Sequence, residues 1–149
     1  MLSLLGEYIV QLDPKSRLRL PAPLCMQLSD VVGRGFVLNR GFERCLTLFP
    51  RHVWDNITTE LQKLDLYTPK HREFVRYFFR GATELTLDNQ QRLLVPSSLA
   101  EYAQLQKIVV VFAYFNRIEL WAKEQYDQLF DNEPSDFSAL AEDIMSKIR

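Results

Sequence analysis

Two aspartate–arginine pairs at one spacing are the residues of this chain best suited to chemistry: Asp13 with Arg17, and Asp88 with Arg92. The aspartate of such a pair can cap a turn and hold the guanidinium of the arginine. The rigid donor fork of arginine can also bridge phosphate oxygens or the O6/N7 edge of guanine. From these residues alone, two interpretations stay open: two structural turns, or two loops that direct arginines toward nucleic acid.

Both pairs lie in a longer internal repeat with an offset of 75 residues. The windows 6–24 and 81–99 share seven of nineteen residues. A chain that repeats one unit over about half its length usually packs two copies of one supersecondary structure. We therefore expect the two Asp-x-x-x-Arg loops to act as a pair. The matched pairs are Gly6/Gly81, Leu12/Leu87, Asp13/Asp88, Arg17/Arg92, Leu18/Leu93, Pro21/Pro96 and Leu24/Leu99.

Each loop is predicted to join two strands, because alternating apolar residues flank it on both sides. In the first copy the alternation places Arg17 and Arg19 on one face of the returning strand and Leu18 on the other. A short helix, a hairpin and a longer helix follow, which gives the order β-α-β-β-α twice. We expect strands at 6–12, 17–20, 36–39, 46–49, 82–87, 92–95, 108–112 and 117–121, and helices at 24–28, from 50, at 69–79 and from a capping box of Ser98 and Glu101.

The sequence predicts four segments: a first repeat at 1–66, a linking helix at 67–80, a second repeat at 81–130 and an amphipathic helix at 131–149. The linking helix carries a line of arginines, Arg72, Arg76 and Arg80, which is either a solvated face or a contact with another subunit or with nucleic acid. The last helix has apolar residues at helical spacing, to be buried on the protein's own body or on a neighbouring copy.

Composition limits the possible functions. The 149 residues are 47% hydrophobic and 25% charged, as expected for a soluble globular protein. A net charge of −1 and a pI near 6.1 exclude a generally basic nucleic-acid coat, so a nucleic-acid role must rest on a local patch. Neither a membrane span nor a signal peptide is evident, which predicts a cytoplasmic protein with no membrane partner. Cys25 and Cys45 are expected to be free, buried thiols.

An enzyme is the second class considered. The histidines, His52 and His71, lack a cysteine, serine or carboxylate partner at a known catalytic spacing. The chain also lacks a glycine-rich phosphate loop and a cluster of metal ligands. We therefore predict a protein without catalytic activity, cofactor or metal.

The sequence resembles the MraZ family over roughly residues 5–130. The resemblance rests on the two Asp-x-x-x-Arg motifs, Leu48-Phe49-Pro50, Arg80-Gly81-Ala82 and Phe115-Asn116-Arg117-Ile118-Glu119-Leu120-Trp121. It implies an α+β fold in which two tandem repeats form an AbrB-like, swapped-hairpin β-barrel core with peripheral helices. It further implies a transcriptional regulator that assembles into a homo-oligomeric ring, is nucleoid-associated, and binds double-stranded DNA at direct repeats upstream of the division and cell-wall operon.

The resemblance also implies which residues contact DNA. The family's contacts centre on the doubled motif, and the second copy here offers only Arg92 as a cation. The implied DNA-binding residues are Asp13, Lys15, Arg17, Arg19, Asp88 and Arg92.

Two features distinguish this chain from the family pattern. The family usually has glycine before the motif arginine, where this chain has Ser16 and Gln91; a non-glycine residue with a left-handed backbone costs about 1 kcal/mol. The windows 6–24 and 81–99 also carry only +1 and −1. We expect one subunit to bind DNA weakly and a ring to raise the apparent affinity by about 100- to 10,000-fold. The alternative is a non-enzymatic assembly or interaction protein that keeps the fold with weak or lost DNA binding.

Overall fold

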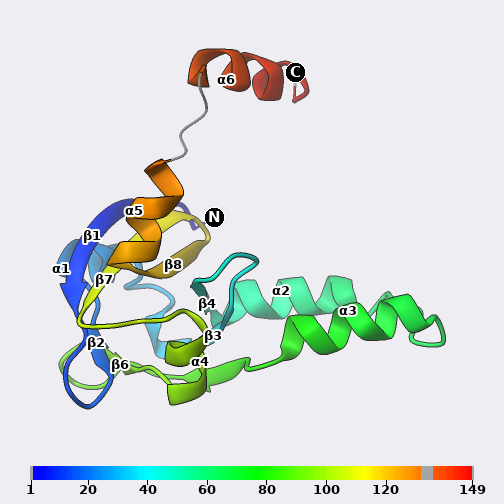
Figure 1. The fold of residues 1–149 in the computed structure, drawn as a ribbon. Coiled ribbons are helices and arrows are strands. Elements are labelled where there is room, and N and C mark those ends of the chain that lie inside the picture. The colour runs from blue at the N-terminus through cyan, green and yellow to red at the C-terminus, as the bar shows by residue number, and fades with distance from the viewer. Residues whose placement is uncertain (1, 132–135, 149) are drawn as a thin grey trace.

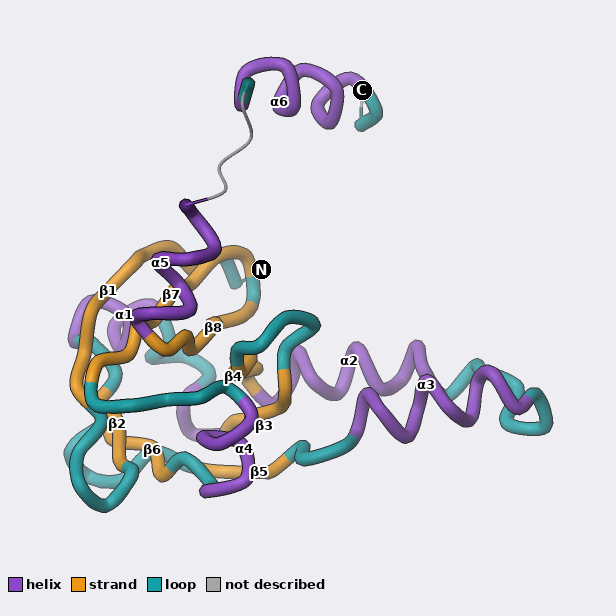
Figure 2. Tube along the Cα trace, in the orientation of Figure 1, coloured by secondary structure: helices purple, strands orange, loops and turns teal. Residues whose placement is uncertain are grey.

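The computed structural model describes residues 2–131 and 136–148 and has the α+β architecture expected from the repeat (Figures 1 and 2). The elements, in chain order, are β1 (Leu4–Gln11), β2 (Arg17–Arg19), α1 (Ala22–Gln27), the 3-10 helix η1 (Val32–Arg34), β3 (Phe36–Arg40), β4 (Leu46–Pro50), α2 (Arg51–Leu61), α3 (Pro69–Phe79), β5 (Thr83–Leu85), β6 (Arg92–Leu94), α4 (Ser97–Tyr102), β7 (Ile108–Phe115), β8 (Arg117–Ala122), α5 (Lys123–Asp131) and α6 (Phe137–Ser146).

The two repeats exchange strands. The main sheet has the order β1-β7-β8-β4-β3-β5, and all its pairs are antiparallel. β1 of the first repeat pairs with β7 of the second, and β5 of the second repeat pairs with β3 of the first. The predicted α+β class with two interlocked repeats is thus confirmed. In strand pairing the sheet is open, with β1 and β5 as its edges.

A second, two-stranded sheet carries the repeated motif. β2 and β6 pair antiparallel, one strand from each repeat. Leu18 and Leu93 lie opposite each other in this ribbon and are both fully buried in the main core. Because successive side chains of a strand point to opposite faces, the apolar face of the ribbon anchors it and the other face is directed outward.

Helices α2 and α3 form a hairpin that extends away from the sheets (Figure 1). Trp54 joins the two helices, since its ring stacks on Phe78 with centroids 5.6 Å apart and contacts Phe79 edge-on. The bounds of α3 match the predicted helix at 69–79. The predicted capping box is wrong: α4 begins at Ser97 after Pro96, and no side chain caps it. Proline with its fixed φ occupies the position that Ser98 was expected to take.

Cys25 and Cys45 are both free thiols; Cys45 is buried and Cys25 half-buried. In the part of the chain that the structure describes, no helix is both long and apolar enough to cross a bilayer. The described residues also contain no group of three or more histidine, cysteine or acidic side chains arranged to bind a metal ion.

Candidate nucleic-acid interface

The first motif forms a closed loop around the Asp13 carboxylate. Its Oδ1 accepts hydrogen bonds from the backbone N–H groups of Lys15 at 2.9 Å and Arg17 at 2.8 Å. Its Oδ2 accepts from the Nε of Arg17 at 2.8 Å. The same carboxylate therefore fixes both the turn and the guanidinium, so the structural and functional interpretations of the motif are compatible.

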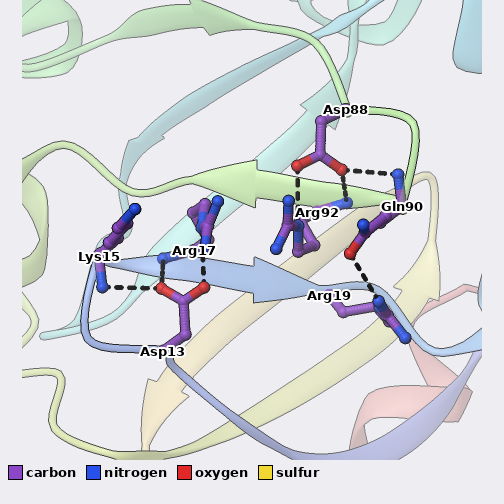
Figure 3. A network of polar contacts seen from close by, with 7 residues as sticks. All are labelled: Asp13, Lys15, Arg17, Arg19, Asp88, Gln90 and Arg92. Atoms are coloured by element: carbon purple, nitrogen blue, oxygen red, sulfur yellow. Dashed lines mark hydrogen bonds and ion pairs between the residues drawn. The ribbon is translucent and has the colours of Figure 1, made fainter.

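The second motif repeats this geometry. Oδ1 of Asp88 accepts from the backbone N–H groups of Gln90 and Arg92, each at 2.9 Å, and its Oδ2 accepts from the Nε of Arg92 at 2.8 Å. Figure 3 shows the two loops at opposite ends of the β2–β6 ribbon. The duplicated sequence has thus produced two equivalent loops, which antiparallel strand pairing places at the two ends of one ribbon.

The residue before each arginine has a left-handed backbone. Ser16 and Gln91 both have φ of 61°. Their carbonyl groups tie the loops across the ribbon: Leu20 N–H donates to Gln91 O at 3.0 Å, and Val95 N–H donates to Ser16 O at 2.8 Å. Each loop therefore keeps a left-handed turn although the residue there is serine or glutamine and not glycine.

The outer face of the ribbon brings together the candidate arginines. Arg19 pairs directly with Arg92, and Arg17 pairs with Leu94. Directly opposed residues of an antiparallel pair share a face, so these four side chains form one surface, which we call the arginine face. All six predicted DNA-binding residues lie in this ribbon or its two loops (Figure 3).

Two further residues on this surface were not predicted. Leu94 is 60% exposed, at the position equivalent to Arg19, and Gln90 is equivalent to Lys15. The Nη2 of Arg19 donates to Gln90 Oε1 at 3.1 Å, which links strand β2 to the second loop. Comparing each position with the one 75 residues later identifies both residues, provided that positions which differ between the repeats are considered as well as those which match. The two halves of the surface thus have the same geometry and different chemistry.

Hydrogen bonding keeps both motif carboxylates charged. Donation from the Arg17 backbone N–H lowers the pKa of Asp13 below its ordinary 3.8, with the Arg17 guanidinium and the Lys15 N–H adding to the effect and partial burial opposing it. The Arg92 backbone N–H likewise lowers the pKa of Asp88. At neutral pH each loop therefore holds its arginine by an ion pair.

The ion pairs leave donors available. Each motif arginine uses Nε for its aspartate, and within the described residues no side-chain hydrogen bond occupies the terminal nitrogens of Arg17 or Arg92. A guanidinium held at Nε presents two parallel N–H donors, which is the geometry that bridges phosphate oxygens or the O6/N7 edge of guanine. A two-stranded ribbon also has a width that the major groove of B-DNA admits.

Fold and surface together define a class of protein: a duplicated α+β chain that presents two copies of one arginine loop on a single ribbon. The chain belongs to the MraZ family. Its residues 3–77 and 78–147 each match the family profile described as "MraZ protein, putative antitoxin-like".

Relatives from three bacteria support the assignment, and each has the name "Transcriptional regulator MraZ". The chain is 36% identical to the protein of Flavobacterium psychrophilum over 149 residues, which cover 99% of this chain and 95% of the relative. It is 39% identical to that of Halothermothrix orenii, covering 92% and 93%. It is 37% identical to that of Desulforamulus reducens, covering 95% and 96%.

Proposed function

We propose that the chain is a sequence-specific, DNA-binding transcriptional regulator without catalytic activity. The observation that carries the proposal is the arginine face, where Arg17 and Arg92 are held at Nε with their terminal nitrogens available. The name of the relatives, transcriptional regulators, supports the same function. The working location is the cytoplasm, in association with the nucleoid.

The residues divide into two roles. Arg17, Arg19 and Arg92 contact base edges or phosphates from the ribbon, and Lys15 at the loop tip contacts the phosphate backbone. Asp13 and Asp88 do not contact DNA through their occupied oxygens; they hold the arginines in place. Leu94, exposed among three arginines, suits the apolar C5-methyl group of thymine.

The unequal halves of the arginine face favour direct repeats as the target. Arg19 on one half is matched by Leu94 on the other, so the ribbon has a direction although its backbone is nearly symmetric. A directional reader that meets successive sites in the same orientation requires subunits arranged head to tail. Head-to-tail contacts close into rings when the rotation permits. We therefore propose a homo-oligomeric ring acting on direct repeats upstream of the division and cell-wall operon.

Assembly is needed for affinity. The net charges of +1 and −1 around the two motifs are small, so a single subunit that binds DNA releases few counterions and gains little affinity from their release. Linked weak sites gain a factor of about 100 to 10,000 when their spacing matches that of the repeats. On this account, the division of the chain into repeats 1–66 and 81–130, joined by residues 67–80, provides one reading ribbon per subunit.

The test is fluorescence anisotropy of labelled DNA from upstream of the protein's own gene, with shuffled DNA of equal composition as the control. The assembled protein is expected to prefer the native DNA by about 1,000-fold or more at moderate salt. The logarithm of its association constant for DNA is expected to fall linearly with the logarithm of the salt concentration, with a slope of about 0.9 for each phosphate contacted. Equal affinity for native and shuffled DNA would reject the regulator and favour the alternative, an assembly protein on the same fold.

A further inference from the structure

Helix α6 has an apolar stripe that the described part of the chain does not cover. No hydrogen bond or ion pair within residues 2–131 and 136–148 joins α6 to another element. Phe137 and Ile148 are 70% and 73% exposed. Their helical spacing puts them on the same face as the other apolar residues. An exposed apolar stripe of this kind marks an interaction surface. Its members are Phe137, Leu140, Ile144 and Met145 on α6 and Ile148 just after the C-cap of the helix.

A matching groove lies on the α2–α3 hairpin. The pocket has a volume of about 370 Å³ and lies between the two helices and the loop that joins them. α3 has no buried residue, so this hairpin is itself incompletely covered. The apolar walls are contributed by Trp54, Leu61, Leu64, Leu66, Val75 and Phe79. Grooves between helices accept an amphipathic helix through anchors at i, i+4 and related spacings, as at Leu140 and Ile144.

Helices α6 and α3 have opposite net charge, and the charged residues that line the groove itself, Arg51 and Asp55, pair with each other. Three acids and one base accompany the stripe of α6: Asp136, Glu142, Asp143 and Lys147. Four bases and one acid lie on α3 and at its C-cap: Lys70, Arg72, Arg76, Arg80 and Glu73. Neither Arg76 nor Glu142 has an ion-pair partner among the described residues. Opposite charges at the rim of an apolar contact select partner and orientation.

We propose that α6 of one copy of the chain docks in the α2–α3 groove of a second copy. α5, which leads to α6, packs on β7 and β8, whereas α2 packs on β3 and β4, and the hairpin extends away from the sheets (Figure 1). The five backbone steps from Asp131 to Asp136 span at most roughly 18 Å. Because α5 and the hairpin pack on different strands of the main sheet, we place α6 in a neighbouring groove and not in the chain's own.

Such a contact is heterologous, because one copy gives a helix and the next gives a groove. Repeated around a closed set of copies, it makes a ring. The inference rests on the proposed ring assembly and deepens it by naming the two surfaces that join successive subunits. It also assigns the arginine line of α3 to a subunit contact, not to DNA.

A mixed cross-linking experiment tests whether the contact joins two chains. In a Cys25→Ser background, one chain carries Val75→Cys and a second carries Ile144→Cys. Mild oxidation of the mixture is expected to give a disulfide-linked dimer, and each protein alone is expected to give much less. If the mixture gives no disulfide-linked dimer, the proposal is overturned. So does a chain carrying both cysteines that forms only an internal disulfide, because the helix then occupies its own groove.

A charge exchange provides the second test, measured as the concentration of half-assembly by mass photometry. Arg76→Glu and Glu142→Arg are each expected to raise that concentration by about two- to fivefold, the range of an exposed ion pair. The two changes together are expected to restore it to near the wild-type value. Glu101→Arg, an exposed site on α4, is the control that should not rescue Arg76→Glu. Rescue by the control, or none by Glu142→Arg, contradicts the docking.

Failure of this inference is distinguishable from failure of the proposed function. A Leu140→Glu variant is expected to lose assembly while its folded body, measured by circular dichroism and thermal unfolding, is unchanged. If the variant assembles and prefers native DNA as wild type does, the docking is wrong and the regulator stands. If the mixed cysteine variants cross-link as expected but wild type shows no DNA preference, the docking stands and the regulator is wrong.

Discussion

Arg19 and Arg92 lie directly opposite each other across the β2–β6 ribbon, one from each repeat. Two guanidinium groups on one face repel each other, and the ribbon offsets this in part through Gln90, which accepts from Arg19, and Asp88, which pairs with Arg92. A surface that concentrates like charges is stabilised further by an anionic ligand. On the proposed function, the ribbon, and not either loop alone, would therefore be the unit that reads DNA.

The unequal halves of the arginine face lead to a first prediction. Leu94→Arg restores the cation that the first repeat has at Arg19, and so adds a phosphate contact. The magnitude of the salt slope of DNA binding is expected to increase by about 0.9 for each subunit engaged. Met26→Arg, at an exposed site on α1, is the matched control and should leave the slope nearly unchanged. Equal effects of the two variants would show that Leu94 does not lie in the interface.

A second prediction concerns the left-handed residues. Ser16→Gly and Gln91→Gly are each expected to raise the free energy of unfolding by about 0.5–1 kcal/mol, because relief of the positive φ exceeds the entropy cost of glycine. Urea denaturation measures the change. Lys15→Gly, one residue earlier and without a positive φ, is expected to destabilise instead. Destabilisation by all three variants would mean that the strain at φ of 61° is negligible.

A third prediction follows from the lowered pKa of Asp13. The contacts of the Asp13 carboxylate contribute fully to folding stability above the unfolded-chain pKa near 3.8. This contribution is lost as the pH falls through the lower folded-state pKa. In Arg17→Ala the pKa of Asp13 is expected to rise but to stay below its ordinary value, because the backbone N–H, the largest cause, is retained. Carboxyl ¹³C shifts measured against pH report it. A full return to the ordinary pKa would assign the effect to the guanidinium instead.

Cysteine reactivity provides a fourth prediction. Burial, followed by the charges of Glu119 and Glu43, raises the pKa of Cys45 to about 12, so its thiolate is scarce at pH 8. An aromatic disulfide reagent is expected to modify half-buried Cys25 first and to reach Cys45 only on unfolding. Cys25→Ser should therefore show almost no reaction in the native state. Rapid native modification of that variant would contradict the buried position of Cys45.

Much of the fold follows from sequence because the repeat and its alternation are local signals. The alternation of Arg17, Leu18 and Arg19 gave the buried and exposed faces of β2, and Pro69 gave the start of α3. The exchange of β1 and β5 between repeats was expected only from the family resemblance, since strand pairing depends on contacts distant in sequence. The cap of α4 was mispredicted because Pro96 and Ser98 both suit a helix start, and local patterns do not choose between them.

The candidate site was predictable to a similar extent. Spacing identified Asp13 with Arg17 and Asp88 with Arg92, and the structure places all four around one ribbon, which the sequence did not predict. Gln90 and Leu94 were missed because neither residue type suggests nucleic-acid binding on its own. Their importance comes from the register of β2 against β6, which places them beside Arg19 and Arg17. Register was not readable from two strands of three residues.

The paired arginines are proposed to read DNA, and a set of charge-removing variants tests this role. Binding to the native upstream DNA is measured by anisotropy for wild type, Arg17→Ala, Arg92→Ala, the double variant and Arg34→Ala, which removes the same charge from η1. Assembly is verified for each by mass photometry. The double variant is expected to lose affinity by about 100-fold or more, together with its preference over shuffled DNA, while Arg34→Ala changes little. Intact preference in an assembled double variant would contradict the account.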